Sequence, residues 1–191
     1  MTILAIDIRK AEIRDADAIA DVHQTSWDGA YAGIIPHRAL NTMISRRGPQ
    51  WWAHAIRRAT SILVVEIGGD VAGYATIGRN RARELPQQGE IYELYLRPEC
   101  QGIGLGTRLL AAARARLAAY NMKSLVVWAL EDNVGAVEFC TRAGGRDIAE
   151  GVRSVRPEGT ARKIAFSWGV SGPAPHAHLD SLYMSTCRNC A

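Results

Sequence analysis

The sequence predicts an α+β domain built around a mixed sheet, and three observations lead to this fold class. Strand-like and helix-like segments do not alternate regularly: a strand precedes two helices, followed by a hairpin, a strand, a helix, a strand, a helix and two strands. The clearest hairpin spans residues 61–80, where β-rich runs flank the turn Gly68-Gly69-Asp70. A strand–helix–strand unit between residues 90 and 131 predicts one parallel pair of strands at the middle of the chain.

The N-terminal part is predicted to hold one strand and two helical stretches. Residues 6–11 alternate apolar and polar side chains, as a strand does. Asp15 is the candidate N-cap of a run whose apolar residues recur near helical spacing. A second helical stretch follows Pro36 and extends to about Ala59, with an interruption near Gly48-Pro49.

The C-terminal half continues with four strands and two helices. The first helix is alanine-rich with one apolar face, and the strand after it is a continuous apolar run of the kind found in buried strands. Asn133 caps the second helix, which Gly144-Gly145 closes. In chain order the predicted segments are the strand 90–98, the helix 106–122, the strand 124–131, the helix 134–143, and the strands 146–154 and 161–168.

Composition indicates one globular domain over residues 1–169 and a tail of uncertain structure over residues 170–191. The chain has 191 residues, with ordinary hydrophobic (48%) and charged (22%) fractions. A net charge of +4 suits an anionic ligand but is too small to indicate nucleic acid. The N-terminus lacks a signal-peptide pattern and no apolar run is long enough for a bilayer. We therefore expect a cytoplasmic protein with no nucleic-acid and no membrane partner.

The cysteines do not suggest a disulfide framework in a chain of this size. The tail combines His176 and His178 with Cys187 and Cys190, four soft ligands that would suffice for tetrahedral zinc. An H-x-H and a single C-x-x-C are each weak signals. The preferred interpretation is a flexible tail or one that packs on a neighbouring subunit, so we predict no metal and leave a homodimer open.

Three glycines at alternate positions, Gly102, Gly104 and Gly106, separate the predicted strand from the long helix. Such a loop is either a tight turn or a place where the backbone binds a ligand. At the start of a helix several N–H groups have no intrahelical partner and the helix dipole adds positive charge. Without Cβ atoms an anion can approach closely, so the stretch predicts a phosphate site. It is neither a P-loop nor a Rossmann fingerprint, because it lacks the spacing of both.

The segment from Gln101 to Gly106 matches the pattern Q/R-x-x-G-x-G/A, and in this context it resembles the GNAT superfamily of N-acetyltransferases. The run from residue 129 to residue 145 is similar to the superfamily's second signature, in which an Asn opens a helix. The segment 26–36 is similar to a common bacterial subgroup. The resemblance covers roughly residues 6–168 and implies a mixed, mostly antiparallel seven-stranded sheet flanked by about four helices.

The resemblance also implies acetyl-CoA as co-substrate. The pyrophosphate would sit on the glycine loop, and the pantetheine arm would add like a strand beside the preceding strand, which needs an exposed edge. Asn133 would contact the pantetheine or the substrate side. The implied main-chain contacts to pantetheine and acetyl group are Leu94, Tyr95 and Leu96, and the implied loop contacts are Gln101, Gly102, Ile103, Gly104, Leu105, Gly106 and Thr107.

Acetyl transfer to an amine needs a base, and the candidates are Glu90 and Glu93. Strand alternation sends them to opposite faces unless a bulge intervenes. Glu90 is preferred, because it falls where the histone acetyltransferase branch carries its basic glutamate. Trp27 and Tyr31 lie on the first helix, which forms a wall of the acceptor site in this fold; an acceptor-binding role and core packing both stay open. His23 is expected to be a surface or packing residue.

Cys140 stands seven residues after Asn133, where many relatives carry a tyrosine thought to protonate the CoA thiolate. It could be that acid, a small buried hydrophobic residue, or a nucleophile. The nucleophile ranks last, because the C-terminal half of a helix raises the pKa of a thiol. The packing role is preferred, with the thiolate protonated by water or by a tyrosine such as Tyr92 or Tyr95.

The sequence thus predicts an N-acetyltransferase that moves the acetyl group of acetyl-CoA to a primary amine by direct attack in a ternary complex. The acceptor would be a small-molecule or peptide amine. The alternatives are a transferase of another acyl-CoA and a non-catalytic CoA-binding sensor.

Overall fold

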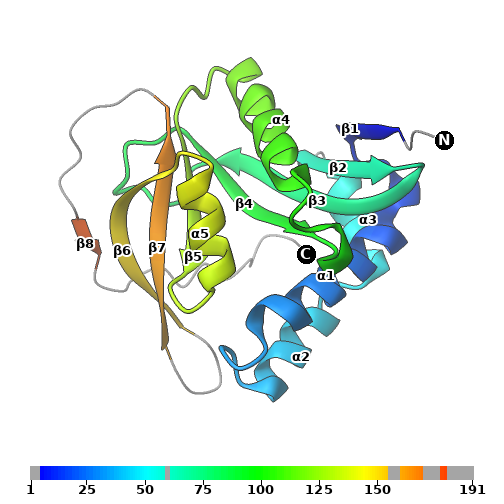
Figure 1. The fold of residues 1–191 in the computed structure, drawn as a ribbon, viewed down its shortest axis with the longest axis horizontal. Helices are drawn as coiled ribbons and strands as arrows, with labels where there is room; N and C mark the ends of the chain where they lie inside the picture. The colour runs from blue at the N-terminus through cyan, green and yellow to red at the C-terminus, as the bar shows by residue number, and fades with distance from the viewer. Residues whose placement is uncertain (1–4, 59–60, 155–159, 170–176, 180–191) are drawn as a thin grey trace.

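The computed structural model describes residues 5–58, 61–154, 160–169 and 177–179, which form one sheet with helices on both sides (Figure 1). The strands are β1 (Ile6–Lys10), β2 (Ser61–Ile67), β3 (Asp70–Arg79), β4 (Gly89–Leu96), β5 (Leu125–Leu130), β6 (Arg146–Ser154), β7 (Thr160–Trp168) and β8 (Ala177–Leu179). The helices are α1 (Ala16–Tyr31), α2 (His37–Ser45), α3 (Pro49–Arg57), α4 (Leu105–Ala119) and α5 (Val134–Arg142), with 3₁₀ turns at Ile13–Asp15 and Pro98–Cys100.

The strand order is β1-β2-β3-β4-β5-β7-β6-β8. Neighbouring strands are antiparallel except for the pairs β4–β5 and β6–β8. The predicted α+β class and the seven predicted strands are confirmed, and the three residues of β8 add a short eighth strand. The parallel β4–β5 pair, joined by α4, is the strand–helix–strand unit expected at the middle of the chain.

The described residues contain five α-helices where about four were expected. The predicted second helical stretch is divided into α2 and α3 at the interruption noted in the sequence. Pro49 is the first residue of α3, and Gly48 before it is extended (φ −72°, ψ −179°). Because proline has no N–H to donate, it can begin a helix but cannot continue one.

Two apolar layers hold the helices to the sheet. On one face α4 packs through Leu105, Leu109 and Leu117, all about 1% exposed or less. On the other face α1 and α3 pack through residues such as Ile19 and Trp52. Figure 1 shows α4 and α5 in front of the sheet and α3 behind β2 and β3. Strands β2 to β4 are therefore covered on both faces, so a ligand reaches this part of the sheet at an edge or through a break in the strands.

A break of this kind begins with a bulge in β4. Ile77 of β3 pairs with Ile91, but the preceding residue Thr76 pairs with Glu93, so Tyr92 is an extra residue in β4. The bulge overturns the expectation that Glu90 and Glu93 face opposite sides of the sheet. Glu90 pairs with Gly78, which is two residues from Thr76 on β3, so both carboxylates lie on the same face.

The second part of the break is a gap between β4 and β5. The two strands pair only from Gly89 to Ile91 on β4 and from Leu125 to Val127 on β5. Beyond these residues β4 continues along β3, and β5 continues along β7. Among the described strands nothing pairs with the facing edges of β4 and β5 past this point, so the sheet opens into a wedge.

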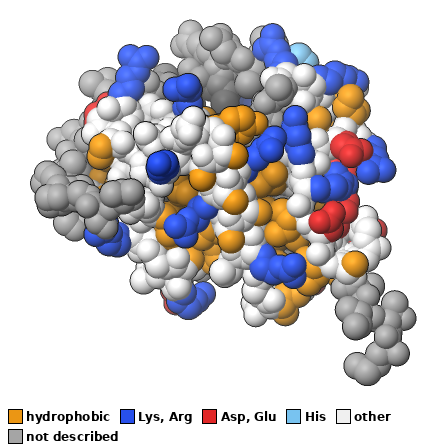
Figure 2. All heavy atoms as spheres, turned by 90° about the horizontal axis from the view of Figure 1, so that it is seen from above, with side chains coloured by type: hydrophobic (Ala, Val, Ile, Leu, Met, Phe, Trp, Pro, Cys, Tyr) orange, Lys and Arg blue, Asp and Glu red, His pale blue; other side chains and the backbone are white. Residues whose placement is uncertain are grey.

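On the face shown in Figure 2 the basic side chains are dispersed. Figure 2 shows Lys and Arg side chains in separate groups across one face, with apolar and uncharged surface between them. No helix in the described ranges is long and apolar enough to cross a membrane. Those ranges also hold no group of three or more His, Cys, Asp or Glu side chains arranged to share a metal ion.

The tail lies mostly beyond what the structure describes. His176, Cys187 and Cys190, weighed as zinc ligands, fall outside the described residues, as does the side chain of His178. The boundary between a domain ending at residue 169 and a tail after it stays a prediction.

Candidate active site

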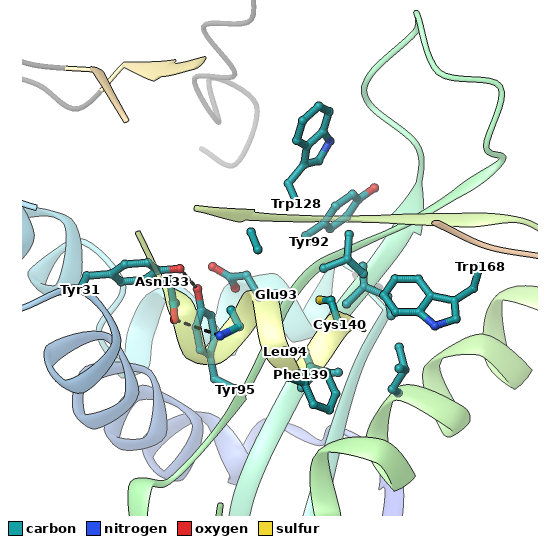
Figure 3. Close-up of a pocket in the computed structure, with 15 residues that line it drawn as sticks. Tyr31, Tyr92, Glu93, Leu94, Tyr95, Trp128, Asn133, Phe139, Cys140 and Trp168 are labelled. Carbon is teal, nitrogen blue, oxygen red and sulfur yellow. Dashed lines mark hydrogen bonds between the residues drawn. The ribbon is translucent and has the colours of Figure 1, made fainter. Parts of the chain in front are cut away.

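A pocket occupies the wedge between β4 and β5 and reaches α1, α4 and α5 (Figure 3). It brings together residues that are distant in sequence, several of which the sequence predicts as site residues. The sequence-predicted site residues that line it are Tyr31, Glu93, Leu94, Tyr95, Asn133 and Cys140. Glu90, Leu96, Trp27 and the glycine loop are not part of this lining. Trp128, Phe139 and Trp168 are among the other residues that line it and were not predicted.

The edge of β4 offers main-chain groups to the pocket at alternate residues. The N–H of Arg97 donates to the carbonyl of Ala72 on β3 (2.9 Å). Hydrogen bonds alternate along an antiparallel pair, so the main chain of Tyr95 is turned to β3, and that of Leu94 and Leu96 is turned away from it, toward the wedge. Tyr95 therefore meets the pocket with its side chain, and not with the main-chain groups expected from the sequence.

The end of β4 is tied to the glycine loop and to α1. The carbonyl of Leu96 accepts hydrogen bonds from Ser26 Oγ (2.9 Å) and from Gln101 Nε2 (3.2 Å). Gln101 thus connects the glycine loop to the end of β4. Because the carbonyl of Leu96 is already bonded, the main-chain group of Leu96 that can bind a ligand is its N–H.

The glycine loop contains two residues with positive φ. Gly102 (φ +77°) and Gly104 (φ +86°) are left-handed, a conformation that favours glycine. Arg108 makes the first helical hydrogen bond, to the carbonyl of Gly104 (3.2 Å). The N–H groups of residues 105–107 precede that bond and have no partner within the helix. A Cβ at Gly102 or Gly104 would project into open space, so a ligand can reach this turn.

Gly106 serves a different purpose. A Cβ at this position would lie 3.1 Å from the ring of Phe139, which lines the pocket. Gly106 therefore allows α4 and α5 to approach each other. Asn133 opens α5 by accepting the N–H of Ala136 at Oδ1 (3.1 Å), so its Nδ2 group is the part that can contact a ligand in the pocket.

Glu93 is the carboxylate at the bulge, and its side chain is 10% exposed. Oε1 forms an ion pair with Arg47, and Oε2 lies 3.5 Å from the hydroxyl groups of Tyr74 and Thr76. The hydroxyl groups of Tyr31 and Tyr95 form a hydrogen bond of 2.7 Å. Figure 3 shows the Glu93 carboxylate pointing toward that pair of hydroxyl groups.

Glu90 lies elsewhere and is fully engaged. Its carboxylate, 5% exposed, accepts hydrogen bonds from the main-chain N–H of Arg81 (2.8 Å), from Nε (3.2 Å) and from Nη2 (2.7 Å) of the same residue. It fixes the loop between β3 and β4. The structure brings Glu93 to the pocket lining and leaves Glu90, the base preferred from the sequence, outside it.

Residues 21–145 match the acetyltransferase (GNAT) family. The chain belongs to this family. It is 32% identical over 134 residues to the uncharacterized N-acetyltransferase YuaI of Bacillus subtilis, covering 70% of this chain and 77% of that one. It is 29% identical over 111 residues to a spermidine N(1)-acetyltransferase of Thermoplasma acidophilum, covering 58% of this chain and 69% of that one. Its fold matches the PaiA N-acetyltransferase of the same organism in complex with coenzyme A (TM-score 0.67, 17% identity, 87% and 99% covered).

Membership in the GNAT family makes the chain an acetyl-transferring enzyme with acetyl-CoA as co-substrate. The pocket contains features suited to that ligand. An unpaired strand edge is the kind of feature that pairs with an amide-bearing arm, and free helix N–H groups are the kind that bind phosphate.

Cys140 lines the pocket and is only 3% exposed. Burial raises the pKa of its thiol to about 12, which makes it a poor proton donor and a poor nucleophile. The two tyrosines considered as acids already form hydrogen bonds through their hydroxyl groups. Tyr92 donates to the carbonyl of Arg79 (2.8 Å), and Tyr95 bonds to Tyr31.

The two aromatic residues of α1 have different surroundings. Trp27 (4% exposed) packs in an apolar cluster with Leu40, and Tyr31 (7% exposed) belongs to the same cluster but also lines the pocket. The guanidinium of Arg47 lies 5.9 Å from the ring of Trp27 and 4.8 Å from that of Trp51. The carboxylate of Glu93 and the two indole rings thus hold the guanidinium of Arg47 beside the pocket.

Proposed function

We propose that this GNAT enzyme transfers the acetyl group of acetyl-CoA to a primary amine by direct attack in a ternary complex. The observation that carries the proposal is the position of Glu93: a carboxylate at the bulge of β4, in the wedge and one residue from the main-chain groups of Leu94. A base and a hydrogen-bond donor to the thioester oxygen are the two groups that this reaction needs most.

Acetyl-CoA would bind along the wedge. Its pyrophosphate would accept hydrogen bonds from the N–H groups of residues 105–107, and its pantetheine arm would pair with the main chain of Leu94 and Leu96. Asn133 would contact the arm from the α5 side. The thioester carbonyl would then lie at the bulge, where the N–H of Leu94 can stabilise the charge that develops on oxygen.

The chemistry follows from these positions. Glu93 takes a proton from the incoming ammonium, directly or through one water molecule, and the neutral amine attacks the carbonyl carbon. The C–N bond forms, the nitrogen gives its second proton to water, the C–S bond breaks, and CoA leaves as a thiolate that takes a proton from water. Cys140 takes no part in the chemistry and fills the wall of the pocket.

A cationic small-molecule or peptide amine is the acceptor that this site suits. Tyr31, Tyr92 and Trp128 bring aromatic rings to the pocket, and Glu93 supplies negative charge. The name of the Thermoplasma relative, a spermidine acetyltransferase, supports an amine of this kind without identifying it. Arg47 competes with such a cation for Glu93, so the acceptor ammonium must displace or share that ion pair.

The test is the release of CoA thiol from acetyl-CoA over a panel of polyamines, amino sugars, amino acids and short peptides. We expect release that depends on the amine, with initial-rate lines that intersect when both substrates are varied. Parallel lines would contradict direct attack. Tight binding of acetyl-CoA with no release over the whole panel would favour the sensor, and faster turnover of another acyl-CoA would contradict acetyl as the transferred group.

A further inference from the structure

We propose that His23 is a positioning residue that acts through the hydroxyl group of Tyr74 to hold the carboxylate of Glu93. The inference rests on the proposed function, since it gives Glu93 its role as the base. His23, Tyr74 and Glu93 come from α1, β3 and β4, and the fold places them in series from the interior to the pocket.

The contacts in this series are direct. Nδ1 of His23 lies 2.8 Å from the hydroxyl oxygen of Tyr74, and that oxygen lies 3.5 Å from Oε2 of Glu93. His23 and Tyr74 are both fully buried. The rings of Trp27 (4.6 Å between centroids) and Trp52 (5.6 Å) pack against the imidazole and fix its orientation.

The hydrogen atoms that these three side chains carry decide which group donates and which accepts in each hydrogen bond. Burial raises the pKa of Tyr74, so its hydroxyl keeps one proton at neutral pH. A carboxylate can only accept, so Tyr74 donates to Glu93 and must accept from His23. This arrangement requires the tautomer of His23 that carries hydrogen on Nδ1.

The state of His23 agrees with this arrangement. Burial, with a smaller effect from Arg47, lowers the pKa of His23 to about 3, so the imidazole is neutral at physiological pH. Its Nε2 has no hydrogen-bond partner among the described residues. An apolar side chain would fill the same space without a buried, unpartnered nitrogen, which costs stability. Packing alone therefore does not explain a histidine here, whereas a donor to Tyr74 does.

The network has a consequence for the base. Arg47 holds Oε1 of Glu93, and the hydroxyl groups of Tyr74 and Thr76 hold Oε2. With both oxygens held, the carboxylate has one orientation toward the pocket. Without the donor from Tyr74, or without His23 to direct that donor, Oε2 loses a contact and the carboxylate can rotate about its own axis. The loss would appear in turnover and not in acetyl-CoA binding.

The first test reads the tautomer directly. Nitrogen-15 chemical shifts of the imidazole, assigned by comparison with a His23→Asn sample, distinguish hydrogen on Nδ1 from hydrogen on Nε2. We expect the Nδ1–H form in the wild-type protein across pH 6 to 8. Hydrogen on Nε2 would mean that Tyr74 donates to His23, and the proposal would be wrong.

The second test uses turnover. Tyr74→Phe and His23→Leu should each lower kcat about tenfold with an unchanged KM for acetyl-CoA, and the double variant should be no slower than either, because both break one chain. His23→Asn keeps a donor near the position of Nδ1 and should retain turnover within about threefold of wild type. Tyr120→Phe is the matched control and should have no effect, because Tyr120 is an exposed tyrosine just after the C-terminal end of α4. Additive losses in the double variant, or equal losses in Asn and Leu variants, would contradict the proposal.

Glu93→Gln separates this inference from the proposed function. If Glu93→Gln keeps wild-type turnover, the proposed base is wrong. If Glu93→Gln is slow while Tyr74→Phe keeps wild-type turnover, only the role of His23 and Tyr74 is wrong. If His23→Leu does not fold, Tyr74→Phe and the tautomer measurement still decide the question.

Discussion

Replacing Glu90 by Gln should lower stability and leave catalysis intact. The carboxylate is 5% exposed and accepts three hydrogen bonds from Arg81, of which an amide oxygen can keep only part. Losing a charge-assisted hydrogen bond costs about 1.5–3 kcal/mol. Arg81 is 42% exposed and can turn to water, so we reduce the expected loss to about 1–2 kcal/mol. For a chain of this length that corresponds to a melting temperature lower by roughly 3–6 °C.

Thermal unfolding and steady-state kinetics on the same preparation test the prediction. Glu138→Gln is the matched control, because Glu138 is 57% exposed and its pairing with Arg142 on α5 should contribute little. We expect Glu90→Gln to lower the melting temperature and to keep kcat within about twofold of wild type. A loss of ~10²-fold in kcat with an unchanged melting temperature would make Glu90 the base, as the sequence suggested, and would refute the placement argument.

Three further predictions concern the pocket and its mouth. Gly104→Val should weaken acetyl-CoA binding by about tenfold or more in calorimetry, whereas Gly69→Val, equally left-handed and equally open around its Cβ but in the β2–β3 turn, should not; equal effects of the two would remove the phosphate assignment. Cys140→Ala should keep activity within about tenfold, and a loss of ~10³-fold with intact acetyl-CoA binding would return Cys140 to the catalytic residues. Arg47→Gln should lower the KM for a cationic acceptor several-fold while lowering kcat, because Glu93 loses both a competitor and a constraint; an unchanged KM would show that Arg47 does not compete with the acceptor.

The parts of the site that lie close together in sequence could be predicted from it. The glycine loop needs left-handed residues between a strand and a helix, and Gly102 and Gly104 supply them. The cap at Asn133 depends on a residue three positions away, so it too is a local feature. The hydrophobic periods located the helices and seven strands, and their number changed only through the break at Pro49 and the short strand β8.

The choice between the two glutamates could not be made from the sequence. The bulge at Tyr92 depends on how β4 pairs with β3, and one extra residue in the register changes the face of every side chain beyond it. The partner of Glu90 comes from a loop nine residues earlier whose conformation no pattern specified. The alternation of side chains along a strand indicates that a bulge would change the faces of Glu90 and Glu93. It does not indicate that a bulge is present.

The network behind Glu93 was missed for a related reason. His23 lies at a core-facing position of α1, where the sequence predicts only a packing or surface residue, and its partner Tyr74 is 51 residues away. Arg47 joins the site from the turn between α2 and α3. A signal was present in the sequence, since a titratable residue on an apolar helix face needs a buried partner, but that signal does not name the partner.

Glu93→Gln in the presence of an accepted amine tests the central claim most directly. The measurement is kcat as a function of pH, together with the dissociation constant of acetyl-CoA from calorimetry. The account predicts a fall in kcat of ~10²-fold or more at neutral pH, loss of the acidic limb of the wild-type profile, and an acetyl-CoA affinity within about twofold of wild type. A variant with the wild-type rate and the wild-type acidic limb would contradict the assignment of Glu93 as the base.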